Sequence, residues 1–127
     1  MGKFISKLVK ARARRKRPVS GLEKQVYALL DSIKIKYKKE YKISRLHVDI
    51  LIEPNLVIEC QGCYFHKHEC LKPKGGWKAS DLVVQDKDSK RFAFLTSQGY
   101  IVKEIWECEM KEPEKVIRKV KSWVKGT

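Results

Sequence analysis

The apolar positions near the start of the chain repeat with the spacing of one helical face. Ser20-Gly21-Leu22-Glu23 matches the capping box, in which the first and fourth side chains satisfy free backbone N–H groups, and this predicts a helix that begins at Ser20. The apolar face continues to about Lys36, so we expect a helix over residues 20–36. Its apolar positions are Leu22, Val26, Leu29, Leu30 and Ile33.

Three strands are predicted to follow this helix. Residues 36–43 alternate weakly between apolar and polar side chains, residues 46–52 are rich in β-forming types, and residues 56–60 form a short apolar run. Glu53-Pro54-Asn55, between the last two segments, is a turn signal. We therefore expect the second and third strands to lie antiparallel across a tight turn.

The rest of the chain adds a loop, two helices and one strand. Residues 61–76 are irregular and rich in Cys, His, Lys and Gly. A helix is expected over residues 77–97, ending before Gly99, and a strand over residues 100–106. Pro113 opens a terminal helix, whose apolar stripe is Val116, Ile117, Val120, Trp123 and Val124. The order α-β-β-β-α-β-α predicts one α/β domain, a mixed sheet flanked by helices, over residues 20–127.

Charge narrows the class of partner. The 127 residues suit one domain, and 29 Lys and Arg against 15 Asp and Glu give a net charge of +14. Such a charge favours a polyanionic partner, nucleic acid first and an acidic membrane surface second, although a basic surface that serves only solubility is the simpler alternative. No apolar run approaches the ~18 residues of a transmembrane helix. We therefore expect no membrane insertion.

The positive charge is concentrated at the N-terminus. Residues 1–22 carry eight basic side chains and no acid. We interpret residues 1–19 as a basic arm that contacts DNA phosphates, the alternative being a solvated tail. Its densest basic residues are Arg12, Arg14, Arg15, Lys16 and Arg17. No apolar segment follows these charges as in a secretory signal, so we expect a cytoplasmic protein. We also expect a prokaryotic, archaeal or phage gene.

Thiol and imidazole groups cluster in the irregular loop. Six candidate ligands of this kind, five of them within eleven residues, are Cys60, Cys63, His66, His68, Cys70 and Cys108. In a reducing compartment such clusters bind metal more often than they form disulfides, and structural zinc needs four ligands. Spacing alone does not identify the four. A redox pair at Cys60 and Cys63, or buried cysteines without metal, are the alternatives.

Two carboxylates stand inside apolar strands. Asp49 follows Val48 and Glu59 follows Ile58, and burying a carboxylate is costly unless it is paired or binds a metal. Two such oxygen ligands at one end of a sheet could hold Mg²⁺ for phosphodiester hydrolysis. With Gln61, the pair resembles the PD-(D/E)xK nuclease signature, with Gln where Lys is usual.

A longer set of motifs resembles the very-short-patch repair (Vsr) endonucleases. The motifs are Gly62-Cys63-Tyr64-Phe65-His66-Lys67-His68-Glu69-Cys70, Trp77, Asp88, Gly99-Tyr100-Ile101-Val102 and Trp106-Glu107-Cys108. The resemblance extends from about Ser20 to Met110. It implies a restriction-endonuclease-like fold, one structural zinc in a zinc-bound loop, a catalytic Mg²⁺ and nicking of DNA 5′ to the thymine of a T·G mismatch.

The resemblance also assigns individual residues. It implies a zinc site of Cys63, His68, Cys70 and Cys108. It makes Asp49 a Mg²⁺ ligand together with the backbone carbonyl of Cys60, and Glu59 is a further candidate. His66 matches the catalytic histidine, although its position beside the zinc ligands also suits an alternative zinc ligand. Glu23 and Asp88 match acids that complete the site, and Tyr64, Phe65 and Trp77 match aromatics that are wedged into DNA.

Two positions depart from the repair enzymes. Glu59 stands where those enzymes are apolar, and Gln61 replaces a histidine.

The motifs and the resemblance together predict a DNA endonuclease that acts on double-stranded DNA as a monomer, without a small-molecule cofactor. A T·G-mismatch nickase is the first interpretation. A homing- or restriction-type enzyme that cuts both strands and a non-catalytic, zinc-stabilised DNA-binding module are the alternatives.

Overall fold

The computed structural model describes residues 21–126. The predicted basic arm and the proposed helix cap at Ser20 lie outside the described residues. The elements follow the predicted order. They are α2 (Gly21–Ser32), β2 (Lys38–Ile43), β3 (Leu46–Ile52), β4 (Leu56–Gln61), the 3-10 turn η1 (Glu69–Leu71), α3 (Ala79–Ser97), β5 (Ile101–Trp106), the 3-10 turn η2 (Glu107–Lys111) and α4 (Pro113–Lys125).

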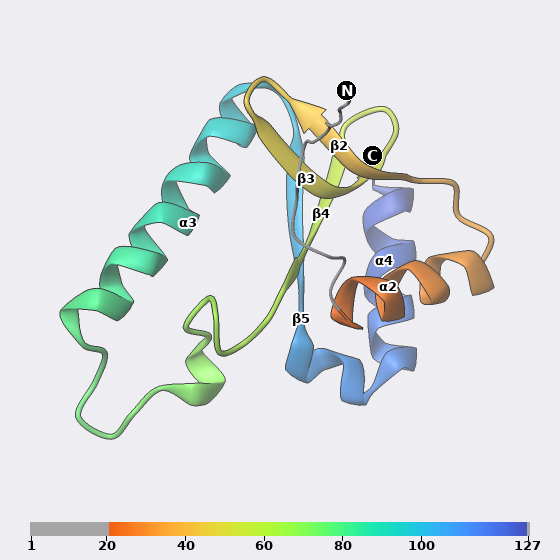
Figure 1. The fold of residues 1–127 in the computed structure, drawn as a ribbon. Helices are drawn as coiled ribbons and strands as arrows, with labels where there is room; N and C mark the ends of the chain where they lie inside the picture. Colours follow the sequence, from red (N-terminus) through yellow and green to blue (C-terminus); the bar gives the residue numbers. More distant parts are fainter. Residues whose placement is uncertain (1–20, 127) are drawn as a thin grey trace, which may run out of the picture.

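The four strands form one mixed sheet in the order β2-β3-β4-β5. The pairs β2–β3 and β3–β4 are antiparallel, and β4 and β5 are parallel, with α3 making the crossover between them. The predicted hairpin across residues 53–55 is therefore confirmed. Helices α2 and α4 cover one face of the sheet, and α3 runs along the other (Figure 1).

Each face of the sheet has its own core. The larger core joins α2 and α4 to the sheet through buried side chains of Val26, Leu30, Ile50, Ile58, Ile105, Val116 and Val120. The smaller core, on the α3 side, includes Val48, Leu51, Val57, Leu95 and Val102. Successive strand residues face opposite sides, so burial of both faces explains why the central strands β3 and β4 are mostly apolar, whereas the edge strand β2 is mostly polar. Among the described residues, no helix is long and apolar enough to span a membrane.

Helix boundaries differ from the sequence prediction where local backbone geometry ends a helix early. Helix α2 ends at Ser32, not near Lys36, because Lys34 adopts a left-handed φ of +59°. The N–H of Lys34 then bonds to the carbonyl of Asp31, and that of Ile35 to the carbonyl of Leu30, which is a Schellman end. Helix α3 begins at Ala79 instead of residue 77. It ends, as predicted, before Gly99, whose φ is +93°.

Candidate active site and metal centre

Three carboxylates, one from α2 and two from the interior of neighbouring strands, lie close together. Glu23 from the first turn of α2, Glu40 from β2 and Asp49 from β3 each place a carboxylate oxygen within 4.8 Å of the others. Glu23 is 2% exposed and Asp49 is 9% exposed. The apolar face of α2 packs on the sheet, and this packing directs Glu23 toward the strands. Oxygen ligands grouped in this way suit a hard cation such as Mg²⁺.

Glu40 is the carboxylate of this group that the sequence did not identify. Its φ is +48°, which is uncommon for a residue with a side chain and often marks a functional position. The β2–β3 pairing continues on both sides of Glu40 and Asp49, with Lys39 opposite Ile50 on one side, but the two acids themselves are not paired. The available signal was weak: Glu40 is the sole acid among the lysines of residues 34–42.

The environment of Asp49 opposes its negative charge. Burial, followed by the charge of Glu59 and the more distant charges of Glu23 and Glu40, raises the pKa of Asp49 from 3.8 to about 7. The N–H of Cys60 donates to Asp49 Oδ2 at 2.7 Å and partly opposes this rise. A divalent cation bound among these oxygens would offset the repulsion between them, so the group fits a metal site.

Glu59, a further candidate for a Mg²⁺ ligand, lies outside this carboxylate group. It is buried, and its Oε1 accepts a 2.7 Å hydrogen bond from Nε of Arg91 on α3. Its Oε2 accepts a bond from the backbone N–H of Asp49 at 3.0 Å. Both carboxylate oxygens are therefore engaged by protein groups, and Glu40 occupies the place in the acidic group that the sequence suggested for Glu59.

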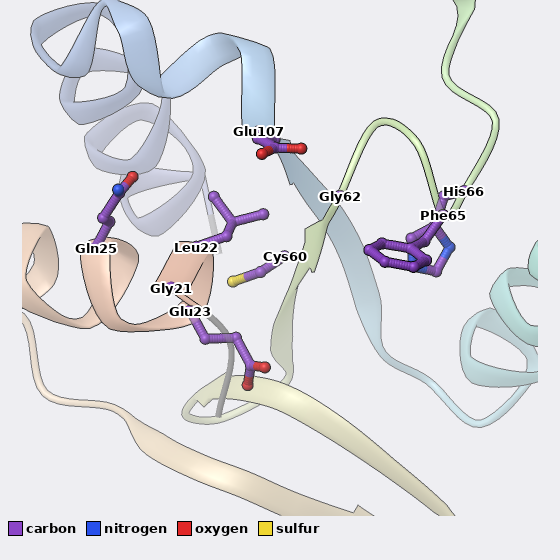
Figure 2. Close-up of a pocket in the computed structure, with 9 residues that line it drawn as sticks. All are labelled: Gly21, Leu22, Glu23, Gln25, Cys60, Gly62, Phe65, His66 and Glu107. Carbon is purple, nitrogen blue, oxygen red and sulfur yellow. The ribbon is translucent and has the colours of Figure 1, made fainter. Parts of the chain in front are cut away.

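A pocket of about 690 Å³ opens beside the carboxylates. Figure 2 shows Glu23 of α2 and Cys60 of β4 on one side of it and Phe65 and His66 of the following loop on the other. The Nδ1 of His66 lies 2.9 Å from Oδ2 of Asp88 on α3. An imidazole paired with a carboxylate is the usual arrangement for a group that exchanges protons. Glu23 and His66 therefore line one pocket, and Asp88 contacts His66; their catalytic roles stay a prediction.

The thiol and imidazole groups resolve into one set of four. The ligand atoms of Cys63, His68, Cys70 and Cys108 lie within 4.8 Å of one another. The sulfurs of Cys63 and Cys108 are each 3.6 Å from Nδ1 of His68. Zinc bonds of ~2.3 Å to sulfur and ~2.05 Å to nitrogen give a tetrahedral S···N edge of about 3.6 Å. The four residues therefore fit a structural zinc ion, and Cys60 and His66 are not part of the group.

The same group ties three segments together. Cys63 follows β4, His68 precedes η1 and Cys70 lies within it, and Cys108 lies in η2 after β5. The His68 ring also stacks on Trp106, with ring centroids 4.0 Å apart. Burial and the neighbouring Cys63 thiol raise the pKa of Cys108 to about 11, which favours the thiol unless a cation is bound. A zinc ion here would fix the loop that carries His66.

The predicted wedge residues are largely exposed. Tyr64 is 66% exposed and Phe65 is 74% exposed, and their rings make an edge-to-face contact at 5.4 Å. The ammonium of Lys67 lies 4.6 Å from the centre of the Tyr64 ring. Trp77 is half-buried at the end of the loop. Core packing therefore does not account for Tyr64 and Phe65.

Gln61 takes part in a side-chain contact of its own. It is buried, and its Nε2 donates to Oε2 of Glu104 on β5 at 3.0 Å. Gln61 occupies the position at which a PD-(D/E)xK nuclease usually carries Lys. The position is therefore filled here by a neutral amide bound to a neighbouring strand.

Comparisons with known proteins support the fold and point to nucleases. The chain is 29% identical over 97 residues to the type II nicking enzyme V.XorIIP of Xanthomonas oryzae pv. oryzae, and the match covers 71% of each chain. Its structure is similar to that of the homing endonuclease I-Bth0305I catalytic domain, with a TM-score of 0.62 and 23% identity. That match covers 84% of this chain and 97% of the domain. No protein-family model matches the sequence. The predicted fold class, a mixed sheet flanked by helices, is confirmed.

Proposed function

We propose that the protein is a Mg²⁺-dependent DNA endonuclease stabilised by zinc. The observation that carries the proposal is the meeting of Glu23, Glu40 and Asp49 beside a pocket that His66 also faces. A relative named as a nicking enzyme and a structural neighbour named as a homing endonuclease support the same class of reaction. A purely DNA-binding module would not require grouped carboxylates together with a His66–Asp88 pair, so we set that alternative aside.

The proposed reaction is attack of water on a DNA phosphate. A bond forms between phosphorus and the water oxygen, and the bond between phosphorus and one deoxyribose oxygen breaks; the water loses a proton, and the leaving oxygen gains one and departs as a hydroxyl. Asp49 would hold Mg²⁺ together with the backbone carbonyl of Cys60, and Glu23 and Glu40 would bind the metal or its waters. When bound, the metal stabilises the charge that develops on the phosphate oxygens. His66 would transfer a proton through Nε2, because Nδ1 faces Asp88. Asp88 would orient the ring and stabilise its protonated form.

The zinc site would serve the fold and not the reaction. Four protein ligands fill a tetrahedral zinc shell and leave no position for water or substrate. The three cysteines of this group form no disulfide, so their thiols are available to bind zinc. Cys63 and His68 bracket the segment 64–67, so the metal would hold His66, Tyr64 and Phe65 in place against the pocket.

Substrate choice follows from the exposed aromatics. Tyr64, Phe65 and Trp77 would insert beside a weakened base pair, where unstacking costs least. We therefore propose nicking at T·G mismatches by a monomer. The departures at Glu59 and Gln61, together with the homing-endonuclease neighbour, favour cutting both strands at a matched sequence as the second candidate.

One experiment separates these two candidates. The protein is incubated with T·G and T·A duplexes of the same sequence, with Mg²⁺, and each strand carries its own label. A mismatch nickase cuts one strand of the T·G duplex faster, and its preference shrinks in the Phe65→Ala variant. Equal rates on both duplexes, with both strands cut, would favour the second candidate and leave the Asp49 and zinc assignments intact.

A further inference from the structure

The inner face of α3 is unusual because it is mostly polar. Its buried residue is Leu95, and the positions that contact the loop and the sheet recur at helical spacing. These positions are Asp81, Gln85, Asp88 and Arg91. Asp81 pairs with Lys67 at 3.4 Å, and Gln85 donates to the carbonyl of Lys67 at 3.0 Å. Polar contacts therefore contribute much of what fixes this helix against the rest of the domain.

One of these polar contacts reaches a proposed catalytic group directly, and another reaches a residue that is bonded to a second catalytic group. Asp88 contacts His66, and Arg91, three residues later on the same face, contacts Glu59. Arg91 also donates through Nη2 to the carbonyl of His47, two residues before Asp49. The guanidinium thus contacts β3 and β4 together. One face of α3 therefore contacts both His66 and Glu59, the residue that binds the backbone of Asp49.

Glu59 connects Arg91 to Asp49 at the point where two strands separate. The β3–β4 pairing extends to Ile50 opposite Ile58 and does not include Asp49 and Glu59. Beyond it, side chains replace the backbone ladder. Glu59 Oε2 accepts from the N–H of Asp49, and Asp49 Oδ2 accepts from the N–H of Cys60. A carboxylate of β4 therefore binds the backbone of β3, and a carboxylate of β3 binds the backbone of β4. Asp49 is fixed through both its backbone N–H and its side chain.

We propose that Arg91 is a positioning residue that acts through Glu59 to hold Asp49 in its metal-binding geometry. Glu59 is 6% exposed, and a buried carboxylate needs a cationic partner to remain ionised in place. Without Arg91, Glu59 loses its partner and releases the N–H of Asp49. The kinetic consequence rests on the proposed function, but the effect on metal binding does not require cleavage.

The test compares Arg91→Met with Lys90→Met. Lys90 is the neighbouring cation on α3 and pairs with Asp86 at the surface, so it controls for the loss of one positive charge. We expect Arg91→Met to raise the Mg²⁺ concentration for half-maximal cleavage tenfold or more, with DNA affinity within twofold of the control. Arg91→Lys keeps the charge and should recover part of the loss. It also serves if Arg91→Met does not fold.

A double-mutant cycle with Glu59→Gln tests the route. If Arg91 acts through Glu59, then Arg91→Met added to Glu59→Gln should change the Mg²⁺ requirement less than twofold. If the two substitutions raise the Mg²⁺ requirement independently, so that their fold-changes multiply in the double variant, the proposal is overturned. A weaker DNA affinity for Arg91→Met than for Lys90→Met, with an unchanged Mg²⁺ requirement, would also overturn it by indicating a phosphate contact.

A binding measurement keeps this inference separate from the proposed function. Mn²⁺ binding to the zinc-loaded protein without DNA is followed by electron paramagnetic resonance. Weaker Mn²⁺ binding by Arg91→Met than by Lys90→Met supports the positioning role even if the wild-type protein cleaves no duplex, in which case the proposed function fails alone. Equal Mn²⁺ binding by the two variants, beside normal wild-type cleavage, would refute the positioning role alone.

Discussion

Replacing Asp49 by asparagine should stabilise the protein when no Mg²⁺ is present. The amide keeps the shape of the side chain and an oxygen for the N–H of Cys60, but it cannot ionise. In the wild-type protein, burial and the charge of Glu59 raise the pKa of Asp49 from 3.8 to about 7. A raised pKa means that folding favours the protonated acid. Wild-type stability is therefore lost as the pH rises from about 4 through 7.

The size of this effect follows from the difference in pKa. At ~1.4 kcal/mol per pKa unit, the folded protein above pH 7 carries a penalty of about 4 kcal/mol, and at pH 5 a penalty of about 1.7 kcal/mol. The free energy of unfolding of the Asp49→Asn variant should therefore exceed that of the wild type by about 2–3 kcal/mol more at pH 8 than at pH 5. Comparing the two pH values cancels any pH-independent effect of the substitution.

Urea unfolding of the zinc-loaded proteins measures this difference. Buffers without added divalent metal are used instead of a chelator, which would also remove zinc. Asp86→Asn is the matched control, because Asp86 is an exposed acid paired with Lys90. The difference in free energy of unfolding between this variant and the wild type should change by less than ~0.5 kcal/mol over the same pH range. Adding Mg²⁺ should stabilise the wild type and not the Asp49→Asn variant. If the free energy of unfolding of the wild type rises relative to that of the variant as the pH rises, this account of Asp49 is refuted.

Three further predictions concern the zinc group, the proton-transfer residue and the basic arm. One equivalent of zinc should co-purify with the protein, and Cys108→Ala should lose the zinc and lower the melting temperature; fully folded, metal-free wild-type protein would contradict this. His66→Ala should slow cleavage by about 10²–10⁴-fold in single-turnover assays with little change in DNA affinity, and a near wild-type rate would exclude proton transfer by His66. Deleting residues 1–17 should lower the salt dependence of DNA binding by ~0.9 in log–log slope for each phosphate that the arm neutralises, and an unchanged slope would show that the arm does not touch DNA.

The sequence predicted the elements because its local signals agree with the fold. Turn residues at 53–55 and Gly99 mark the ends of strands and of α3, and the two central strands, β3 and β4, are mostly buried and therefore mostly apolar. The helix end at Lys34 was missed because Ile33 and Ile35 continue the apolar pattern and pack against the core beyond the last helical turn. A left-handed lysine carries no sequence signal comparable to glycine.

The site was predicted where a motif is dense and missed where the fold alone creates the contact. The spacing of Cys63, His68 and Cys70 marks a metal site, although the residues by themselves left the choice among six ligands open. Glu40 and Arg91 have no motif. Glu40 reaches the site through an uncommon backbone angle, and Arg91 reaches from α3 to a β4 residue 32 positions earlier in the chain. Such contacts depend on tertiary packing, which periodicity does not record.

The most direct test of the central claim is cleavage of labelled duplex DNA by the wild-type protein and the Asp49→Asn variant, both zinc-loaded, with and without Mg²⁺. We predict Mg²⁺-dependent strand scission by the wild type. The variant should show no scission above background while binding the same duplex with an affinity within a few-fold of the wild type, because the substitution removes a metal ligand and no phosphate contact. Scission by the variant at a rate near that of the wild type would contradict the account.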